Sequence, residues 1–248
     1  MKLKSILGIL LFCGLYSHAQ QPFEKKVRFG IKAGINGSLF TKTVDPFGPV
    51  QRNRFNEFSR FVRISGFGGL TADAAVAKRV TIGAELLFNS RGMAYREENY
   101  DVVIIDEDGN EQQAYNDFNY NIDYIEFPLT VNYDFNEPSS NVWFAAYAGI
   151  APGVAINYIT KLRYEKSPDG GGRRNNNEKS TLDHVNHFNN SLLAGIKVGE
   201  HNKKRTAVFA DFRTSYTLLP VFNMTEADNG NNLNTRMLTL SIGLGVRF

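Results

Sequence analysis

Apolar and polar residues alternate along most of the chain, with a period of two residues rather than the 3.6 of a helix. The clearest alternation is at the C-terminus, where apolar residues occupy every second position from Leu238 to Phe248. Seven other segments share the pattern: 27–40, 64–77, 80–92, 125–133, 142–159, 192–198 and 208–213. It is weaker in 64–77 and in 142–159. Such alternation is typical of β-strands with one apolar face, so the sequence predicts eight strands.

Segment 142–159 has a second interpretation, because its eighteen residues include no charge and could form a membrane-spanning helix. Pro152 and Gly153 interrupt its middle, and both residues disfavour a helix interior. The aromatic and β-branched content of the segment also favours a strand.

The connections between the predicted strands alternate strictly between short and long. The short ones are 78–79, 134–141 and 200–205, and the long ones are 41–60, 93–118, 160–187 and 219–235. Outer-membrane barrels combine short periplasmic turns with long outer loops. The pattern therefore predicts an all-β fold, an eight-stranded antiparallel up-and-down transmembrane β-barrel, with both termini periplasmic and the loops outside.

Alternation alone leaves open which face of the strands points outward. A soluble ligand-binding barrel such as a lipocalin has the same number of strands and hides its apolar face inside. The polar face here carries charges of both signs that could form ion pairs in a narrow interior, beside small glycines. We predict this interior network to be Arg28, Lys32, Glu85, Glu126, Lys197, Asp211, Arg213 and Arg247.

The first nineteen residues have the order of a secretory signal peptide. Lys2 and Lys4 precede an apolar run, and small residues lie at −3 and −1 before Gln20. A short buried helix is the alternative. We expect residues 1–19 to be cleaved, and residues 20–248 to form a single barrel domain. The only cysteine, Cys13, lies in the leader, so the mature chain would have no disulfide.

Charge and hydropathy exclude two classes of protein. The net charge is +3, and loss of the two leader lysines leaves +1, with no basic tract of the kind that binds nucleic acid. A mean hydropathy of −0.30 argues against a helical membrane bundle. The leader, the aromatic C-terminus and the asymmetry of the connections favour the outer-membrane barrel over the soluble one.

Candidate metal and catalytic groups are sparse, and each has a simpler interpretation. Residues 106–111 resemble part of a calcium loop but lack the spacing of an EF-hand, and a hairpin with a type I′ turn at Asp108-Gly109 fits better. His184 and His187 lie beside Asp183 without a third ligand, which favours a solvated loop. The glycine-rich segment 170–174 precedes no helix, so a loop is favoured over a phosphate cradle.

Catalysis on lipid would require a serine and a histidine together on the lipid-facing rim of the barrel. His187 is predicted at a strand mouth and Ser191 inside, so the two are not paired. Aromatic residues near both strand ends suggest two membrane-interface girdles. The outer set is Phe40, Phe88, Tyr95, Tyr120, Tyr158 and Tyr216, and the inner set is Phe29, Tyr133, Phe135, Trp143, Phe144 and Phe248.

Several short motifs resemble the small outer-membrane β-barrel family that includes PorT-like proteins. They are residues 29–36 (FGIKAGIN), 83–88 (GAELLF) followed by Arg91-Gly92, 124–129 (YIEFPL) and 148–152 (AGIAP). The end of the chain resembles the signal recognised by the outer-membrane insertion machinery, with Leu244, Val246 and Phe248 as its apolar positions. The resemblance implies location and fold rather than a defined chemistry.

These observations lead us to expect a structural or surface-binding role, with no catalytic residues, cofactor, metal site or large pore. The expected partners are outer-membrane lipid, the barrel-assembly machinery and other envelope or secretion-system proteins, and not nucleic acid. Two alternatives remain open at this point: an outer-membrane enzyme acting on lipid, and a PorT-like component of a protein-secretion system.

Overall fold

The computed structural model describes residues 27–42, 44, 59–106, 108–136, 142–164, 176–200, 206–223 and 234–248. The predicted leader lies outside these residues. The regular secondary structure in the described part consists of eleven strands: β1 Val27–Phe40, β2 Ser59–Phe61, β3 Arg63–Ala77, β4 Val80–Ile105, β5 Glu111–Glu126, β6 Leu129–Asp134, β7 Val142–Tyr164, β8 Asn176–Thr181, β9 Phe188–Glu200, β10 Ala207–Thr217 and β11 Met237–Arg247. The described residues include no helix long and apolar enough to cross a membrane.

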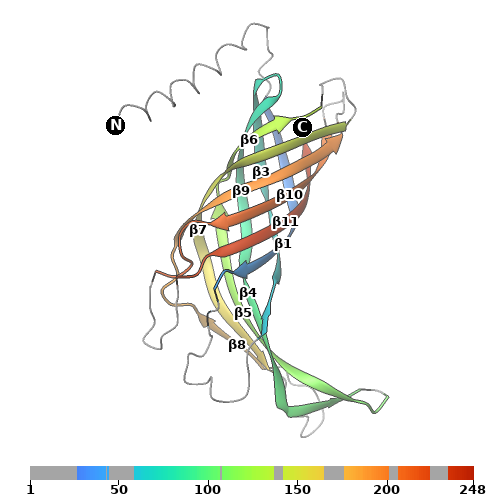
Figure 1. Cartoon of the computed structure of the whole chain (residues 1–248), viewed down its shortest axis with the longest axis vertical. Coiled ribbons are helices and arrows are strands. Elements are labelled where there is room, and N and C mark those ends of the chain that lie inside the picture. The colour runs from blue at the N-terminus through green and yellow to red at the C-terminus, as the bar shows by residue number, and fades with distance from the viewer. Residues whose placement is uncertain are drawn as a thin grey trace.

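The sheet closes on itself, and every pairing in it is antiparallel (Figure 1). β1 pairs with β3 on one side and with β11 on the other, which joins the first strand to the last. β5 and β6 are two parts of one strand, because both pair with β4 and with β7 in an unchanged register on either side of Pro128. Proline has no N–H to donate to the ladder, so the hydrogen bonding is interrupted there while the strand continues. The wall therefore has eight strand positions, as predicted, and β2 and β8 are additions beyond it.

The register fixes the inclination of the strands. Following paired residues around the barrel from Leu39 leads back to β1 at Phe29, ten residues earlier in the chain. The path passes through Leu238, Tyr216, Leu192, Ile150, Leu129, Ala84 and Ala72. Such a stagger over eight strands inclines them by about 40° to the barrel axis, and each residue then rises roughly 2.5 Å along that axis.

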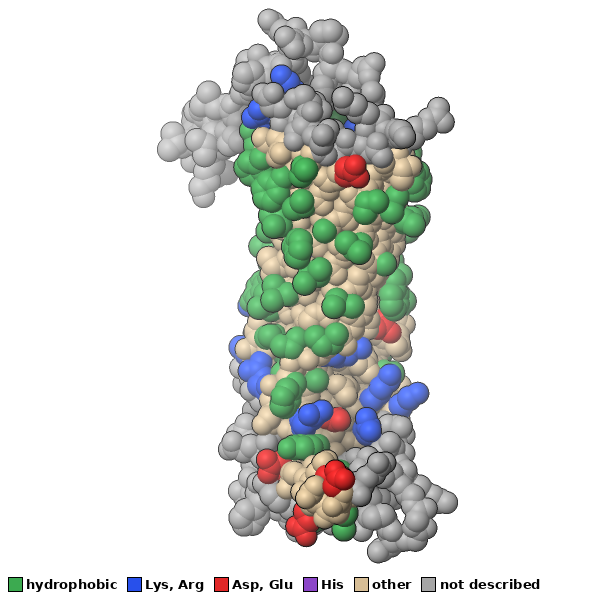
Figure 2. Space-filling view, turned by 90° about the vertical axis from the view of Figure 1, so that its right-hand side faces the viewer, with side chains coloured by type: hydrophobic (Ala, Val, Ile, Leu, Met, Phe, Trp, Pro, Cys, Tyr) green, Lys and Arg blue, Asp and Glu red, His purple; other side chains and the backbone are tan. Residues whose placement is uncertain are grey.

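An apolar band surrounds the outside of the wall (Figure 2). On β1 and β11 it includes Ile31, Ile35, Leu240 and Leu244, which are more than half exposed. From Leu238 to Phe248 the band rises about 25 Å along the axis, the height of a membrane-spanning apolar belt. The positions between these residues face inward and are polar or glycine. The soluble alternative, with its apolar face inside, is therefore wrong.

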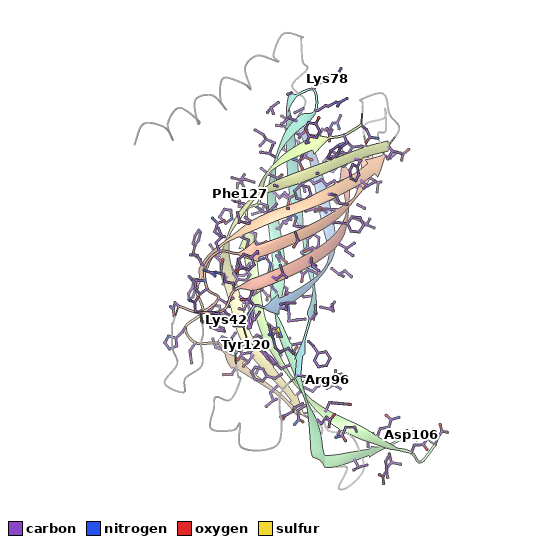
Figure 3. All side chains as sticks on the ribbon, viewed as in Figure 1. Lys42, Lys78, Arg96, Asp106, Tyr120 and Phe127 are labelled. Atoms are coloured by element: carbon purple, nitrogen blue, oxygen red, sulfur yellow. The ribbon has the colours of Figure 1, made fainter. Side chains whose placement is uncertain are left out.

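The predicted strands are present, and β1 has the predicted bounds. Segment 142–159 lies in strand β7, so the helical alternative is also wrong. The main error concerns residues 93–118, which we expected to be a connection. They instead extend β4 and β5 into a hairpin that projects far beyond the band, with Asp106 at its tip, at the end opposite the Lys78 turn (Figure 3).

The polarity of the two faces inverts where β5 leaves the band. Beyond the band, the residues on its inner face are apolar, and those between them are polar. The inner set is Phe118, Tyr120, Ile122 and Tyr124, and the polar set is Asp117, Asn119, Asn121 and Asp123. From Ile125 onward the apolar residues lie outside. The strand geometry is unchanged, but lipid surrounds it on one side of this point and water on the other.

Candidate functional site: the barrel interior

Four charged side chains form a compact cluster inside the half of the barrel nearer the short turns. Lys32 on β1 lies at its centre, with Nζ 2.9 Å from Oε1 of Glu85 and 2.7 Å from Oδ2 of Asp211. Arg213 binds the same carboxylates, with Nη2 2.8 Å from Oε2 of Glu85 and 3.4 Å from Oδ2 of Asp211. All four side chains are at most 8% exposed. Two cations thus neutralise two carboxylates contributed by different strands.

Aromatic rings and further charges extend this cluster toward the short-turn end. Tyr147 donates its hydroxyl proton to Asp211 and accepts a hydrogen bond from Nε of Arg213 at 3.0 Å. Asp73 lies more loosely between two cations, 3.8 Å from Nζ of Lys197 and 3.7 Å from Nη1 of Arg247. The guanidinium of Arg247 also stacks 3.8 Å from the ring centre of Trp143. Side chains, rather than open space, therefore occupy this end of the interior.

A second polar cluster follows on the side of the long loops. Nη2 of Arg91 lies 2.5 and 2.6 Å from the two oxygens of Glu126. Asn89 donates to Glu126 at 2.8 Å and accepts from Asn36 at 2.8 Å. Ser191 accepts a weak bond from Arg91 at 3.4 Å. These groups link β1, β4, β5 and β9 across the interior.

Beyond this second cluster the interior becomes apolar. Residues from the strands and from the segments after β1, β8 and β10 form one buried hydrophobic cluster: Phe40, Val44, Met93, Tyr95, Phe118, Tyr120, Ile122, Tyr124, Ala155, Leu182, Val185, Val221, Phe222 and Met237. Backbone hydrogen bonds join the segments above it, including Val221 N–H to Thr235 O and Asn186 N–H to Val221 O. This apolar cluster covers the long-loop end of the interior.

The structure places seven of the eight predicted network residues inside the barrel, each with a side chain at most 8% exposed. Arg28 differs from the prediction, because it is exposed at the short-turn rim. Two interior members were absent from the predicted set, Asp73 and Arg91. Alternation in 80–92 could have identified Arg91, whereas the glycine-rich segment around Asp73 gave only a weak signal.

Interior glycines provide space for charged side chains, as we expected, at Gly83 beside Asp73 and at Gly153 beside Glu126, and others provide space for aromatic rings. A Cβ added at Gly245 would lie 2.3 Å from Cζ of Phe209, and one at Gly195 would lie 2.5 Å from the hydroxyl of Tyr147. The rings in turn pack against cations, with Lys197 5.1 Å from the Tyr147 ring centre. Glycines, rings and charges therefore pack as one unit.

The outer aromatic girdle was predicted only in part, because Phe88 and Tyr216 are exposed but three other members point inward. Phe40, Tyr95 and Tyr120 belong to the buried apolar cluster. In the inner set Trp143 is also buried. Four of that set are well exposed on the outside and fit the prediction: Phe29, Tyr133, Phe135 and Phe248.

Where the structure describes them, the remaining candidate sites show no metal or catalytic geometry. Asp106 accepts backbone hydrogen bonds from Asp108 and Asn110, which lowers the pKa of its carboxyl below the ordinary value. The turn is the predicted hairpin, but not type I′, since Gly109 has a positive φ and Asp108 does not. No group of three metal-ligating side chains occurs among the described residues. His187 packs against Tyr158, while Ser191 is buried, as predicted. The glycine-rich segment 170–174 lies outside the described residues.

A closed eight-position wall, an outer apolar band and a polar interior are the features of an outer-membrane barrel. The family described as outer membrane protein beta-barrel domain matches residues 18–247. The chain belongs to this family. It is therefore an outer-membrane β-barrel protein, as the short motifs suggested, although the PorT-like subgroup is not shown.

Three solved structures are similar to this family member over most of its length. Neisserial surface protein A is 14% identical, with 89% of this chain and 97% of that chain covered and a TM-score of 0.34. OprG from Pseudomonas aeruginosa is 9% identical, with 90% and 97% covered and a TM-score of 0.41. The attachment invasion locus protein Ail of Yersinia pestis is 12% identical, with 90% and 99% covered and a TM-score of 0.34. No curated protein sequence matches the chain.

Proposed function

We propose that this protein is a non-conducting outer-membrane barrel with a structural or surface-binding role. The filled interior carries the proposal. Paired charges occupy the half of the interior near the short turns, and the buried apolar cluster occupies the other half. An eight-stranded barrel is just wide enough for side chains to fill, so a solute would have to displace buried ion pairs.

The proposed orientation places the long-loop end outside the cell and both termini in the periplasm. The connection from β3 to β4 is a turn at Lys78-Arg79, whereas β4 and β5 project far beyond the band at the other end. Outer-membrane barrels have their short turns on the periplasmic side. In this orientation the projecting hairpin reaches further from the cell than any other part of the chain that the structure describes.

The proposed partners follow from this arrangement. The apolar band contacts lipid, and the C-terminal residues Leu244, Val246 and Phe248, of which the first and the last are well exposed, would be available to the barrel-assembly machinery before β11 closes on β1. Envelope proteins would meet the loops and the hairpin. No described residue specifically favours lipid hydrolysis or a role in secretion.

Conductance in a planar lipid bilayer tests the proposal. A difference in gel migration between unheated and heated samples shows that the purified protein is folded. We expect this protein to give no stable single-channel steps. Reproducible steps of porin size would overturn the closed interior. A variant in which Val221 and Phe222 are both replaced by serine serves as a comparison, because it weakens the apolar cluster without changing a charge. The ion pairs of the other half stay in place in this variant, so we expect no stable steps from it either.

A further inference from the structure

The outer part of the hairpin formed by β4 and β5 is an acidic arm, a name used here for residues 97–116. Its sequence contains seven Asp and Glu residues and no Lys or Arg. Asp108 and Glu111 are exposed near its tip. Val103 and Ile105 are also exposed, by 53% and 67%, although they lie beyond the apolar band and away from lipid. Exposed aliphatic side chains on a charged, projecting element favour a contact surface for protein.

The acidic arm turns to one side of the barrel. Between Asn99 and Val103 the register with β5 shifts, and residues 100–102 of β4 have no partner in β5. Extra residues of this kind bend a strand. The arm bends toward the right in Figure 1, and Asp106 at its tip lies to the side of the wall in Figure 3. The arm therefore extends over the space beside the barrel, where a neighbouring membrane protein would lie.

A basic patch lies on the outer wall at the same end of the barrel. It consists of Lys161 and Arg163 on β7 and Lys179 on β8, which are all exposed. The register places Lys161 directly opposite Lys179, and like charges in such positions destabilise an antiparallel pair. Asp117 lies opposite Arg163, but the same carboxylate also binds Arg96. The basic patch therefore keeps an excess of positive charge.

The acidic arm and the basic patch lie at similar heights beyond the apolar band. Arg163 pairs with Asp117, and the arm begins at the neighbouring residue of β5, Asn116. The arm bends next to Ala114, three residues beyond Asp117. Because each strand residue rises roughly 2.5 Å along the axis, the bend lies roughly 8 Å further out than the patch. Extended lysine side chains span most of this difference.

Copies of the protein in one membrane share their orientation, which brings these two surfaces to matching heights. In Figure 1 the arm points to the right, whereas β8 lies at the left of the wall. Two copies side by side can therefore bring the arm of one against the basic patch of the other. Contact between two arms, or between two patches, would place like charges together and is disfavoured.

We propose that the acidic arm binds the basic patch of a second copy of this chain. Asp108 and Glu111 of one copy would meet Lys161 and Lys179 of the next. Because the arm and the patch are different surfaces, each contact leaves one of each free, so copies join into chains or rings rather than closed dimers. This inference goes beyond the proposed function and is independent of a closed interior, so a conducting barrel would leave it unchanged.

Disulfide cross-linking tests the contact with the full mature chain in vesicles of phosphatidylcholine, whose headgroup has no net charge. The expected mature chain has no cysteine, since Cys13 lies in the leader. N110C places a thiol at the tip of the arm, and T181C places one on the same face of β8 as Lys179; both positions are exposed and uncharged. We expect a mixture of N110C and T181C copies to form disulfide dimers, and either variant alone to form far fewer. Copies that carry both cysteines should give trimers and longer products.

Charge reversal locates the contact. D108K/E111K in the N110C copy, or K161E/K179E in the T181C copy, should lower the yield of mixed dimers roughly fivefold, because each exposed ion pair contributes about a twofold gain in binding and reversal adds repulsion. Mixing the two reversed copies should restore the yield, since the charges are exchanged but remain complementary. K78E, at the opposite end of the barrel, is the matched control and should leave the yield unchanged.

A difference in gel migration between unheated and heated samples verifies that each variant is folded. Equal yields from the mixture and from the single variants would overturn the proposal, because random collision would then explain the cross-links. The proposal would also be overturned if the two reversed copies gave the same low yield together as each gives with an unreversed partner.

Discussion

Removal of Arg91 should be the most damaging single change in the interior. Methionine in its place keeps much of the aliphatic volume but leaves the carboxylate of Glu126 without a cation within ion-pair distance among the described residues. Lys32 provides an informative comparison, because its loss would leave Glu85 and Asp211 still bound to Arg213.

The expected loss of unfolding free energy in Arg91→Met follows from the burial of the Arg91–Glu126 pair. Both side chains are 4% exposed, and Nη2 of Arg91 contacts both oxygens of Glu126. Removing one partner of such a pair costs about 3–5 kcal/mol. Asn89 still donates to Glu126 in the variant, which keeps part of the carboxylate satisfied. We therefore expect Arg91→Met to lower the free energy of unfolding by roughly 3 kcal/mol.

Equilibrium unfolding in urea, with the protein reconstituted in lipid vesicles, measures this loss. Fluorescence of Trp143 reports unfolding without interference from another tryptophan, because the chain has only one. The double variant R91M/E126Q should recover most of the lost stability, since glutamine can accept from Asn89 without carrying a charge. Replacing Arg96, whose pair with Asp117 is largely exposed, is the matched control and should cost about 1 kcal/mol or less.

Two results would contradict this reasoning. One is an equal loss from Arg91→Met and Arg96→Met, which would mean that burial does not strengthen the interior pair. The other is a double variant no more stable than R91M, which would mean that the loss comes from packing rather than from an unpaired charge.

Three further predictions concern the strand end, the ring packing and the hairpin tip. Phe248→Ala should reduce the yield of heat-modifiable protein in membranes, because the last strand must close against β1; a normal yield would contradict this. Gly245→Ala should cost about 1–3 kcal/mol of unfolding free energy in urea through its clash with Phe209, and Gly66→Ala, with 3.6 Å of clearance, should be neutral. Recovery of the unfolding free energy when Phe209→Leu is added to Gly245→Ala would confirm the clash. Since hydrogen bonds from the turn hold the pKa of Asp106 below its ordinary 3.8, the turn should stay ordered at that pH and loosen only as the pH falls through the lowered value. Amide shifts of the turn in NMR measure this, and Asp106→Asn should abolish the titration.

The barrel wall was predictable from the sequence because its two faces meet different surroundings. Alternation identifies a strand wherever lipid lies on one side and a polar interior on the other. β11, with apolar residues at alternate positions up to Phe248, gives this signal without interruption.

The turn of the projecting hairpin was predicted, but the continuous strands that carry it were not, for a physical reason that is visible in β5. Its alternation continues past Tyr124 but with the opposite phase, because water replaces lipid outside and apolar side chains replace charges inside. A search for one continuous pattern ends at that point. The same inversion explains why Tyr95 and Tyr120 resembled girdle residues while pointing inward.

Individual ion pairs could not be predicted from the sequence, since they depend on which strands face each other across the interior. Asp73 shows the difficulty most clearly. It lies in a strand whose glycines weaken the alternation, and its two cations come from β9 and β11, more than a hundred residues away. Pairing of this kind is set by strand register and stagger rather than by local sequence.

The two partners of Lys32 have a consequence for the order of assembly. Glu85 is 53 residues further along the chain, whereas Asp211 is 179 residues further along, on β10, the second strand from the C-terminal end. A partly assembled sheet that entered the bilayer with β1 alone would bring an ammonium group into hydrocarbon before its second carboxylate had arrived. Such an intermediate is disfavoured, so committed insertion should await the C-terminal strands. Folding would then be slow and concerted, with a rate set by the longest chain separation.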